Sequence, residues 1–250
     1  MDLIVVEGRV LPEVREVSIP RIDPIHFKHP NGFEAEFKFI VENGKVFVTC
    51  NVIERCEDYV RFCIIRAYEY ATALIDIFAF SKGWALSLIL DTLIQNDVRQ
   101  RIALSEQNVQ AHCTVLRDHA DFQEVCALVL PNLNLRFAFH DLVSSLSTLN
   151  YSAIAACRAV EVVRDLISPD TPDDRAWKLM REKLNIERSY LQLVTDASRK
   201  PRHGNRGATD GRVQMEVTNR AWVIMNRYLE FIKRGGQDAL PSDFFAVLKA

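Results

Sequence analysis

A run of basic residues near position 200 holds the side chains best suited to chemistry. Within ten residues lie three arginines, whose permanently charged forks suit phosphate, and a histidine, which titrates near neutrality. A glycine after the histidine permits close approach of the backbone to a ligand. These residues are Arg199, Arg202, His203, Gly204 and Arg206. Such a set could bind RNA phosphates, and it could also cleave RNA if the histidine moved the proton of a 2′-hydroxyl.

The same run has a purely structural interpretation. Arg199 and Lys200 would complement the negative end of a preceding helix dipole, and His203 with Gly204 would form a C-terminal cap. Capping, phosphate binding and hydrolysis therefore all remain open at the level of sequence.

A second group of charges lies on an earlier helix. Arg158, Glu161 and Arg164 are spaced three residues apart, so they share one helical face. They can form surface ion pairs with one another, or they can point toward the basic run. In the second case Glu161 would reach His203, orient its ring and raise its pKa. We therefore include Arg158 and Glu161 among the candidate ligand-binding residues.

The elements that must position these residues are helices. Apolar residues at helical spacing predict four helices, which the short connections arrange as an antiparallel bundle. Thr171 is the expected cap of the third, and Pro201 is expected to end or kink it. The four predicted helices span residues 135–148, 152–167, 173–200 and 212–233.

The N-terminal part reads as mixed β and α structure. Alternating apolar residues on either side of Asn43-Gly44 predict a hairpin with a type I′ turn. Two apolar helices are expected at 57–78 and 84–94, and a strand at 109–115. Pro131 is the clearest break, so we predict an α+β protein with domains 1–131 and 132–250.

Composition excludes several classes of function. With 31 Lys+Arg against 33 Asp+Glu, the chain has no global field that would draw it onto nucleic acid or a membrane, so such a partner must be met by a local patch. No dinucleotide or phosphate-loop fingerprint occurs, so we expect no cofactor. The six cysteines form no Cys-x-x-Cys pair, and the spacing of His112, His119 and His140 matches no compact metal motif. We expect a cytoplasmic protein with no metal and no membrane association.

The C-terminal half resembles a known family. Ala156-Cys157-Arg158-Ala159-Val160-Glu161, the helix led by Trp177, and Pro201-Arg202-His203-Gly204 together look like the HEPN-type helical bundles (higher eukaryotes and prokaryotes nucleotide-binding), over about residues 133–235. The resemblance implies a dimer in which an arginine and a histidine of each protomer form a metal-independent ribonuclease site, or a bundle that only binds nucleotides. The N-terminal part matches no family that we can name.

The spacing within the basic run favours binding over cleavage. Only three residues separate Arg199 from His203, which is fewer than HEPN nucleases usually have, and Pro201 lies in the gap. The leading expectation is therefore a homodimer that binds RNA or nucleotide through the basic run. One alternative is a non-catalytic dimeric interaction or scaffold protein, and the other is a metal-independent ribonuclease of toxin or defence type.

Overall fold

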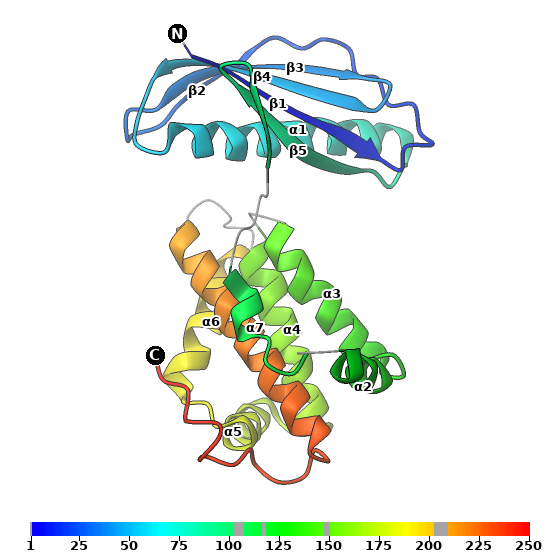
Figure 1. Cartoon of the computed structure of the whole chain (residues 1–250), viewed down its shortest axis with the longest axis vertical. Coiled ribbons are helices and arrows are strands. Elements are labelled where there is room, and N and C mark those ends of the chain that lie inside the picture. The colour runs from blue at the N-terminus through cyan, green and yellow to red at the C-terminus, as the bar shows by residue number, and fades with distance from the viewer. Residues whose placement is uncertain (1, 103–107, 117–118, 148–150, 203–209) are drawn as a thin grey trace. The chain divides into compact units, whose positions relative to one another are not determined.

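The computed structural model describes residues 2–102, 108–116, 119–147, 151–202 and 210–250 (Figure 1). The chain forms two compact units, Met1–Ala103 and Leu104–Ala250. The first is a sheet with one helix and the second is helical, so the predicted α+β class is confirmed. None of the helices in the described ranges is long and apolar enough to span a bilayer.

The N-terminal unit is a six-stranded antiparallel sheet in the order β2-β3-β4-β1-β5-β6. Its elements are β1 (Asp2–Leu11), β2 (Ile25–Lys28), β3 (Glu34–Glu42), β4 (Lys45–Glu54), α1 (Tyr59–Lys82), β5 (Ser87–Gln95) and β6 (Val98–Arg101). Figure 1 shows α1 lying along one face of the sheet, and the apolar residues of that face pack against Cys63, Ala67, Ala71 and Ile75 of the helix.

The predicted hairpin is confirmed as β3 and β4. Asn43 and Gly44 adopt φ angles of 50° and 75°, as a type I′ turn requires. Alternate residues of both strands are buried because successive side chains of a strand point to opposite faces. The helix predicted from 57 to 78 is likewise confirmed as α1.

Two predictions in this region are wrong. The second apolar helix, 84–94, is the strand β5, which pairs with β1 and β6. A short apolar run fits a strand between two neighbours as well as a helix, and here the pairing decides. The strand predicted at 109–115 is instead the short 3₁₀ helix η1 (Asn108–His112), followed by a segment whose backbone N–H groups at Thr114 and Val115 are bound by the Asn226 side chain.

The C-terminal unit is built around one central helix. Its elements after η1 are α2 (His119–Val129), α3 (Leu133–Ser147), α4 (Ser152–Ile167), α5 (Asp173–Leu184), α6 (Arg188–Arg202) and α7 (Gly211–Lys233). The helix α4 packs against α3, α5, α6 and α7, and its apolar residues form the middle of the core. The predicted helices at 135–148, 152–167 and 212–233 are confirmed as α3, α4 and α7.

The third predicted helix is wrong, because the chain forms two helices there. Asn185 takes a left-handed conformation, with φ 54°, and ends α5. Its side-chain amide donates to the carbonyls of Leu240 and Phe245, at 2.6 and 3.1 Å, which holds the C-terminal segment against this turn. The region is therefore not a bundle of four helices.

The ends of these helices also differ from expectation. Thr171 does not cap α5: its hydroxyl donates to the carbonyl of Pro169 at 3.2 Å, and Pro172 occupies the cap position. Pro201 lies within the last turn of α6, which is described as far as Arg202.

The division of the chain lies earlier than the predicted boundary after Pro131. That position falls inside the second unit, between α2 and α3. The helix α2 belongs with α7, because Lys233 binds Asp121 and Glu124 at 3.0 and 2.8 Å, and Val125 packs with Leu229. A proline between two helices of one core therefore marks a turn and not a domain boundary.

Candidate functional site

The predicted basic run lies at the end of α6. Arg199 and Arg202 are both exposed and share one face of the helix, since they are three residues apart. The other predicted residues, His203, Gly204 and Arg206, lie outside the described residues. The structure therefore places two of the predicted arginines at one surface.

Glu161 and Arg202 form a bidentate ion pair between α4 and α6. Nη1 and Nη2 of Arg202 donate to Oε1 and Oε2 of Glu161, at 2.8 and 3.0 Å. The hydrogen bond from Glu161 raises the pKa of Arg202. Glu161 thus points toward the basic run, and its partner in the described structure is Arg202, the neighbour of His203 in sequence.

The other two charges of this α4 face contact different helices. Nε of Arg158 lies 3.3 Å from Oδ2 of Asp141 on α3. Arg164 pairs with Asp173 at 3.0 Å and lies over the Trp177 ring, 4.8 Å from its centroid. A pocket of about 420 Å³ between α3 and α4 brings Arg158 and Glu161 together. Its lining is Asn134, Phe137, Asp141, Arg158, Glu161, Val162, Arg164 and Asp165.

The residue beneath the ion pair of Glu161 and Arg202 is buried. Cys157 is buried, and its thiol donates to Oε1 of Glu161 at 3.8 Å. Burial raises the pKa of this thiol, with a smaller opposing effect from the hydrogen bond to Ser198. Because a nucleophilic cysteine needs a depressed pKa and access to solvent, Cys157 is a packing residue.

A polar stripe continues from the basic run along the whole of α6. Its five residues recur at steps of four and three, so they lie on one side of the helix. We call this stripe the basic face of α6, and its members are Arg188, Gln192, Thr195, Arg199 and Arg202. The three arginines extend over about 21 Å at the usual rise per residue.

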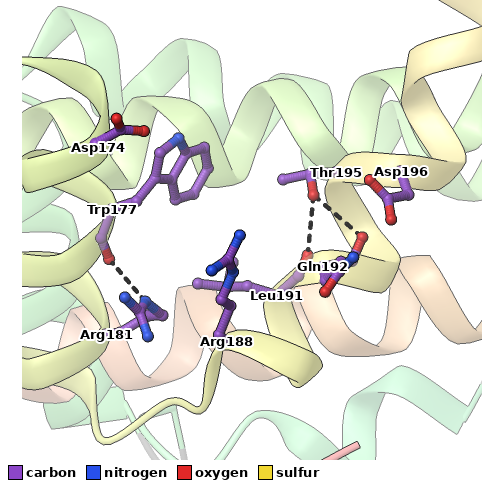
Figure 2. Close-up of a pocket in the computed structure, with 8 residues that line it drawn as sticks. All are labelled: Asp174, Trp177, Arg181, Arg188, Leu191, Gln192, Thr195 and Asp196. Carbon is purple, nitrogen blue, oxygen red and sulfur yellow. Dashed lines mark hydrogen bonds between the residues drawn. The ribbon is translucent and has the colours of Figure 1, made fainter.

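At its beginning the basic face enters a groove between α5 and α6, with a volume of about 520 Å³ (Figure 2). We call it the α5–α6 groove. Trp177 and Arg181 reach it from α5, and Figure 2 shows them across the opening from the α6 residues. Its lining is Asp174, Trp177, Arg181, Arg188, Leu191, Gln192, Thr195 and Asp196.

Sequence reasoning missed this groove because it assumed one continuous helix. Trp177 is half-buried and packs against the core of the helical unit. The available signal was Asn185, since asparagine tolerates a left-handed conformation and can end a helix. Two helices that run in different directions then replace one long helix (Figure 1), and the side chains between them line the opening.

The described residues provide no metal centre. No group of three or more histidine, cysteine or acidic side chains with the geometry for a metal ion occurs among them. His140, one of the three histidines considered above, is exposed on α3.

Comparison with protein families gives two matches. The model of the N-terminal domain of DUF8168, a domain of unknown function, matches residues 4–104, and the model of its C-terminal domain matches residues 122–233. Together they span most of the chain and follow the two structural units. No curated protein and no solved structure matches.

Proposed function

We propose that this chain, which belongs to the DUF8168 family of domains of unknown function, binds RNA through the basic face of α6. The observation that carries the proposal is the alignment of Arg188, Arg199 and Arg202 on one side of a single helix. Arginines in a row can follow a phosphodiester backbone without reading its sequence. The resemblance of the C-terminal unit to HEPN-type bundles leads to the same class of ligand.

Arg199 is more available to a phosphate than Arg202. Its side chain is exposed, and no carboxylate partner occurs for it among the described residues. Arg202 is bound on two nitrogens by Glu161, so a phosphate at this position must compete with that carboxylate. We therefore expect weak binding that decreases as salt is added, because a few arginine–phosphate contacts form on a chain whose net charge is -2.

The experiment is a titration of a labelled single-stranded oligouridylate at about 50 mM salt, followed by fluorescence anisotropy. Replacing Arg199 and Arg202 together by alanine should weaken binding about tenfold or more, since each lost phosphate contact costs about 1 kcal/mol. The matched control replaces Arg175 and Lys178, two exposed cations of α5 outside the groove lining. Equal affinities of the two double variants would reject the proposal.

The same RNA can be used to test whether the protein also hydrolyses RNA. Cleavage that persists in a chelator and disappears in His203→Ala would add a metal-independent ribonuclease activity to binding. Intact RNA after long incubation would leave binding as the whole function.

A second candidate function is self-association. Five large apolar side chains of the α2 and α3 region are more than half exposed, which is typical of a surface that contacts another protein. They are Phe122, Leu130, Leu133, Phe137 and Val143. Size-exclusion chromatography with light scattering tests this candidate. We expect the unmodified protein to be a dimer and the Phe137→Ser variant to be a monomer. A monomeric unmodified protein would contradict self-association.

A further inference from the structure

We propose that the α5–α6 groove binds a nucleoside monophosphate, with the phosphate on Arg181 and Arg188 and the base on Trp177. This site goes beyond RNA binding, because it depends on the groove and does not need Arg199 or Arg202. A free nucleotide can bind here whether or not RNA binds to the rest of α6.

The groove has a positive end and a negative end. The chain turns at Asn185, so residues near the turn lie at one end of the two helices, and residues far from it lie at the other. Arg181 and Arg188 flank the turn, whereas Asp174 and Asp196 are each eleven residues away from it. Figure 2 shows Arg181 and Arg188 near each other, whereas Asp174, beside Trp177, and Asp196, beyond Thr195, lie on opposite walls of the groove.

Both arginines can offer nitrogens to an anion. Nε of Arg181 donates to the carbonyl of Trp177 at 3.3 Å, which fixes the side chain and leaves its terminal nitrogens available. Arg188 is exposed, and we find no carboxylate partner for it in the described part of the chain. Two guanidinium groups at one end of a groove match the oxygens of a terminal phosphate.

Trp177 is a rigid surface for a planar ring. Arg164 lies 4.8 Å from the ring centroid and is itself held by Asp173 at 3.0 Å, so one side of the indole is already packed. The ring is half-buried and lines the groove, where a nucleobase can stack on it for about 1 to 3 kcal/mol. The volume of about 520 Å³ lies within the range of roughly 300–1,000 Å³ that small-molecule sites have.

The remaining lining suits a sugar and a base that donate hydrogen bonds. Asp174 and Asp196 accept hydrogen bonds, as carboxylates do from ribose hydroxyls in nucleotide sites. The Thr195 hydroxyl donates to the carbonyl of Gln192 at 3.1 Å, so its oxygen is left to accept. Gln192 can both donate and accept.

Other anions fit less well. Inorganic phosphate uses the arginines alone, and an acidic peptide would place further negative charge beside Asp174 and Asp196, where repulsion is unfavourable. Only a ligand with an anion at one end, a flat ring between, and donors at the other end uses the whole groove.

The experiment is calorimetric titration of the full chain with adenosine 5′-monophosphate, adenosine and inorganic phosphate. The monophosphate should bind at least tenfold more tightly than either other probe. Arg188→Ala should weaken its binding about tenfold, the usual effect of losing a charge-assisted hydrogen bond. The matched control Arg175→Ala, which removes an exposed arginine of α5 outside the groove, should leave binding unchanged.

Trp177 needs two variants, because it also packs against the core. Trp177→Phe keeps a flat ring and should bind the monophosphate within about threefold of the unmodified protein, whereas Trp177→Leu should lose tenfold or more. Circular dichroism tests whether both variants fold. If Trp177→Leu does not fold, the effect of Arg188→Ala on monophosphate binding decides the inference.

Several results would overturn the inference. They are no binding of the monophosphate at millimolar concentration, equal binding of inorganic phosphate, tighter binding of an acidic peptide, or the same loss in Arg175→Ala as in Arg188→Ala. The double variant of Arg199 and Arg202 should bind the monophosphate normally. Arg188 belongs to both proposed sites, so the double variant of Arg199 and Arg202 separates the two proposals, because it should lose RNA binding and keep monophosphate binding.

Discussion

Glu161 controls how much of Arg202 a ligand can reach. The carboxylate occupies two nitrogens of the guanidinium, and part of what the arginine offers to a phosphate is already used. The contact also explains why charge counting along the sequence overstates the positive potential at the end of α6. The Glu161 carboxylate and an RNA phosphate therefore compete for Arg202, and a single substitution of Glu161 can change the outcome.

Replacing Glu161 by glutamine should therefore tighten RNA binding. The amide keeps the shape of the side chain and removes its negative charge, so we expect about a threefold gain in affinity at low salt, within the usual value of an exposed ion pair. Anisotropy with the oligouridylate measures it. Glu182→Gln, an exposed carboxylate on α5 that pairs with Lys178, is the control, and an equal gain in that variant would contradict a specific role for Glu161.

The sequence predicted a shared face for these charges and left open whether they pair with one another or point toward the basic run. The three-residue spacing of Arg158, Glu161 and Arg164 identified a shared face, and Glu161 does point toward the basic run. The partners Asp141, Asp173 and Arg202 come from three other helices. Spacing within one helix cannot indicate them, because they depend on how the helices pack.

At the scale of elements, one residue divides α5 from α6 and so creates the groove. Asn185 combines a left-handed backbone with five hydrogen bonds. Its side chain donates two, its backbone N–H donates one to the Arg181 carbonyl, and its own carbonyl accepts two, from the Leu248 N–H and Arg227. The turn therefore also anchors the C-terminal segment.

Substitution of Asn185 should separate these two contributions. Asn185→Gly keeps the left-handed conformation but loses the side-chain bonds, so we expect the free energy of unfolding to fall by about 1 to 3 kcal/mol. Asn185→Ala adds the cost of a left-handed alanine, a further 1 kcal/mol or so. Urea unfolding measures both, and identical values for the two variants would show that backbone strain contributes nothing here.

Gly8 has a comparable role in the N-terminal sheet. A Cβ atom at this position would lie 1.9 Å from the carbonyl oxygen of Ile89, at the point where the register of β1 and β5 shifts. Gly8→Ala should destabilise this unit by about 3 kcal/mol or more, because two backbones must separate. Gly211→Ala, where the added atom meets nothing within 4 Å, should be neutral or stabilising. Thermal unfolding tests the pair, and equal melting temperatures would contradict the close approach.

The elements themselves were predictable to different degrees. Helices with an amphipathic pattern and a marked end, such as α4 and α7, agree with the sequence. The strand β5 was not predicted from the sequence, because its residues from Leu88 to Ile94 are partly buried on both faces and show no alternation of apolar and polar residues. Asn185 was missed because nothing in the apolar periodicity changes across it.

At the scale of the whole molecule, each of the two units has its own hydrophobic core. One core belongs to the sheet and α1, the other to the helical unit, and all the residues argued to bind ligand lie in the second. The two compact units meet near residue 103, whereas the sequence suggested a boundary after Pro131, because this proline is more conspicuous in sequence than the junction. A proline in the sequence indicates where a helix or strand is interrupted, whereas the boundary of a structural unit depends on which elements pack together.

The salt dependence of RNA binding tests the central claim most directly. If Arg199 and Arg202 contact phosphates, the slope of log affinity against log salt concentration should decrease in magnitude by about 0.7 for each arginine replaced by alanine. The Arg175 and Lys178 control should keep the slope of the unmodified protein. Equal slopes for all three proteins would mean that RNA does not contact the basic face of α6.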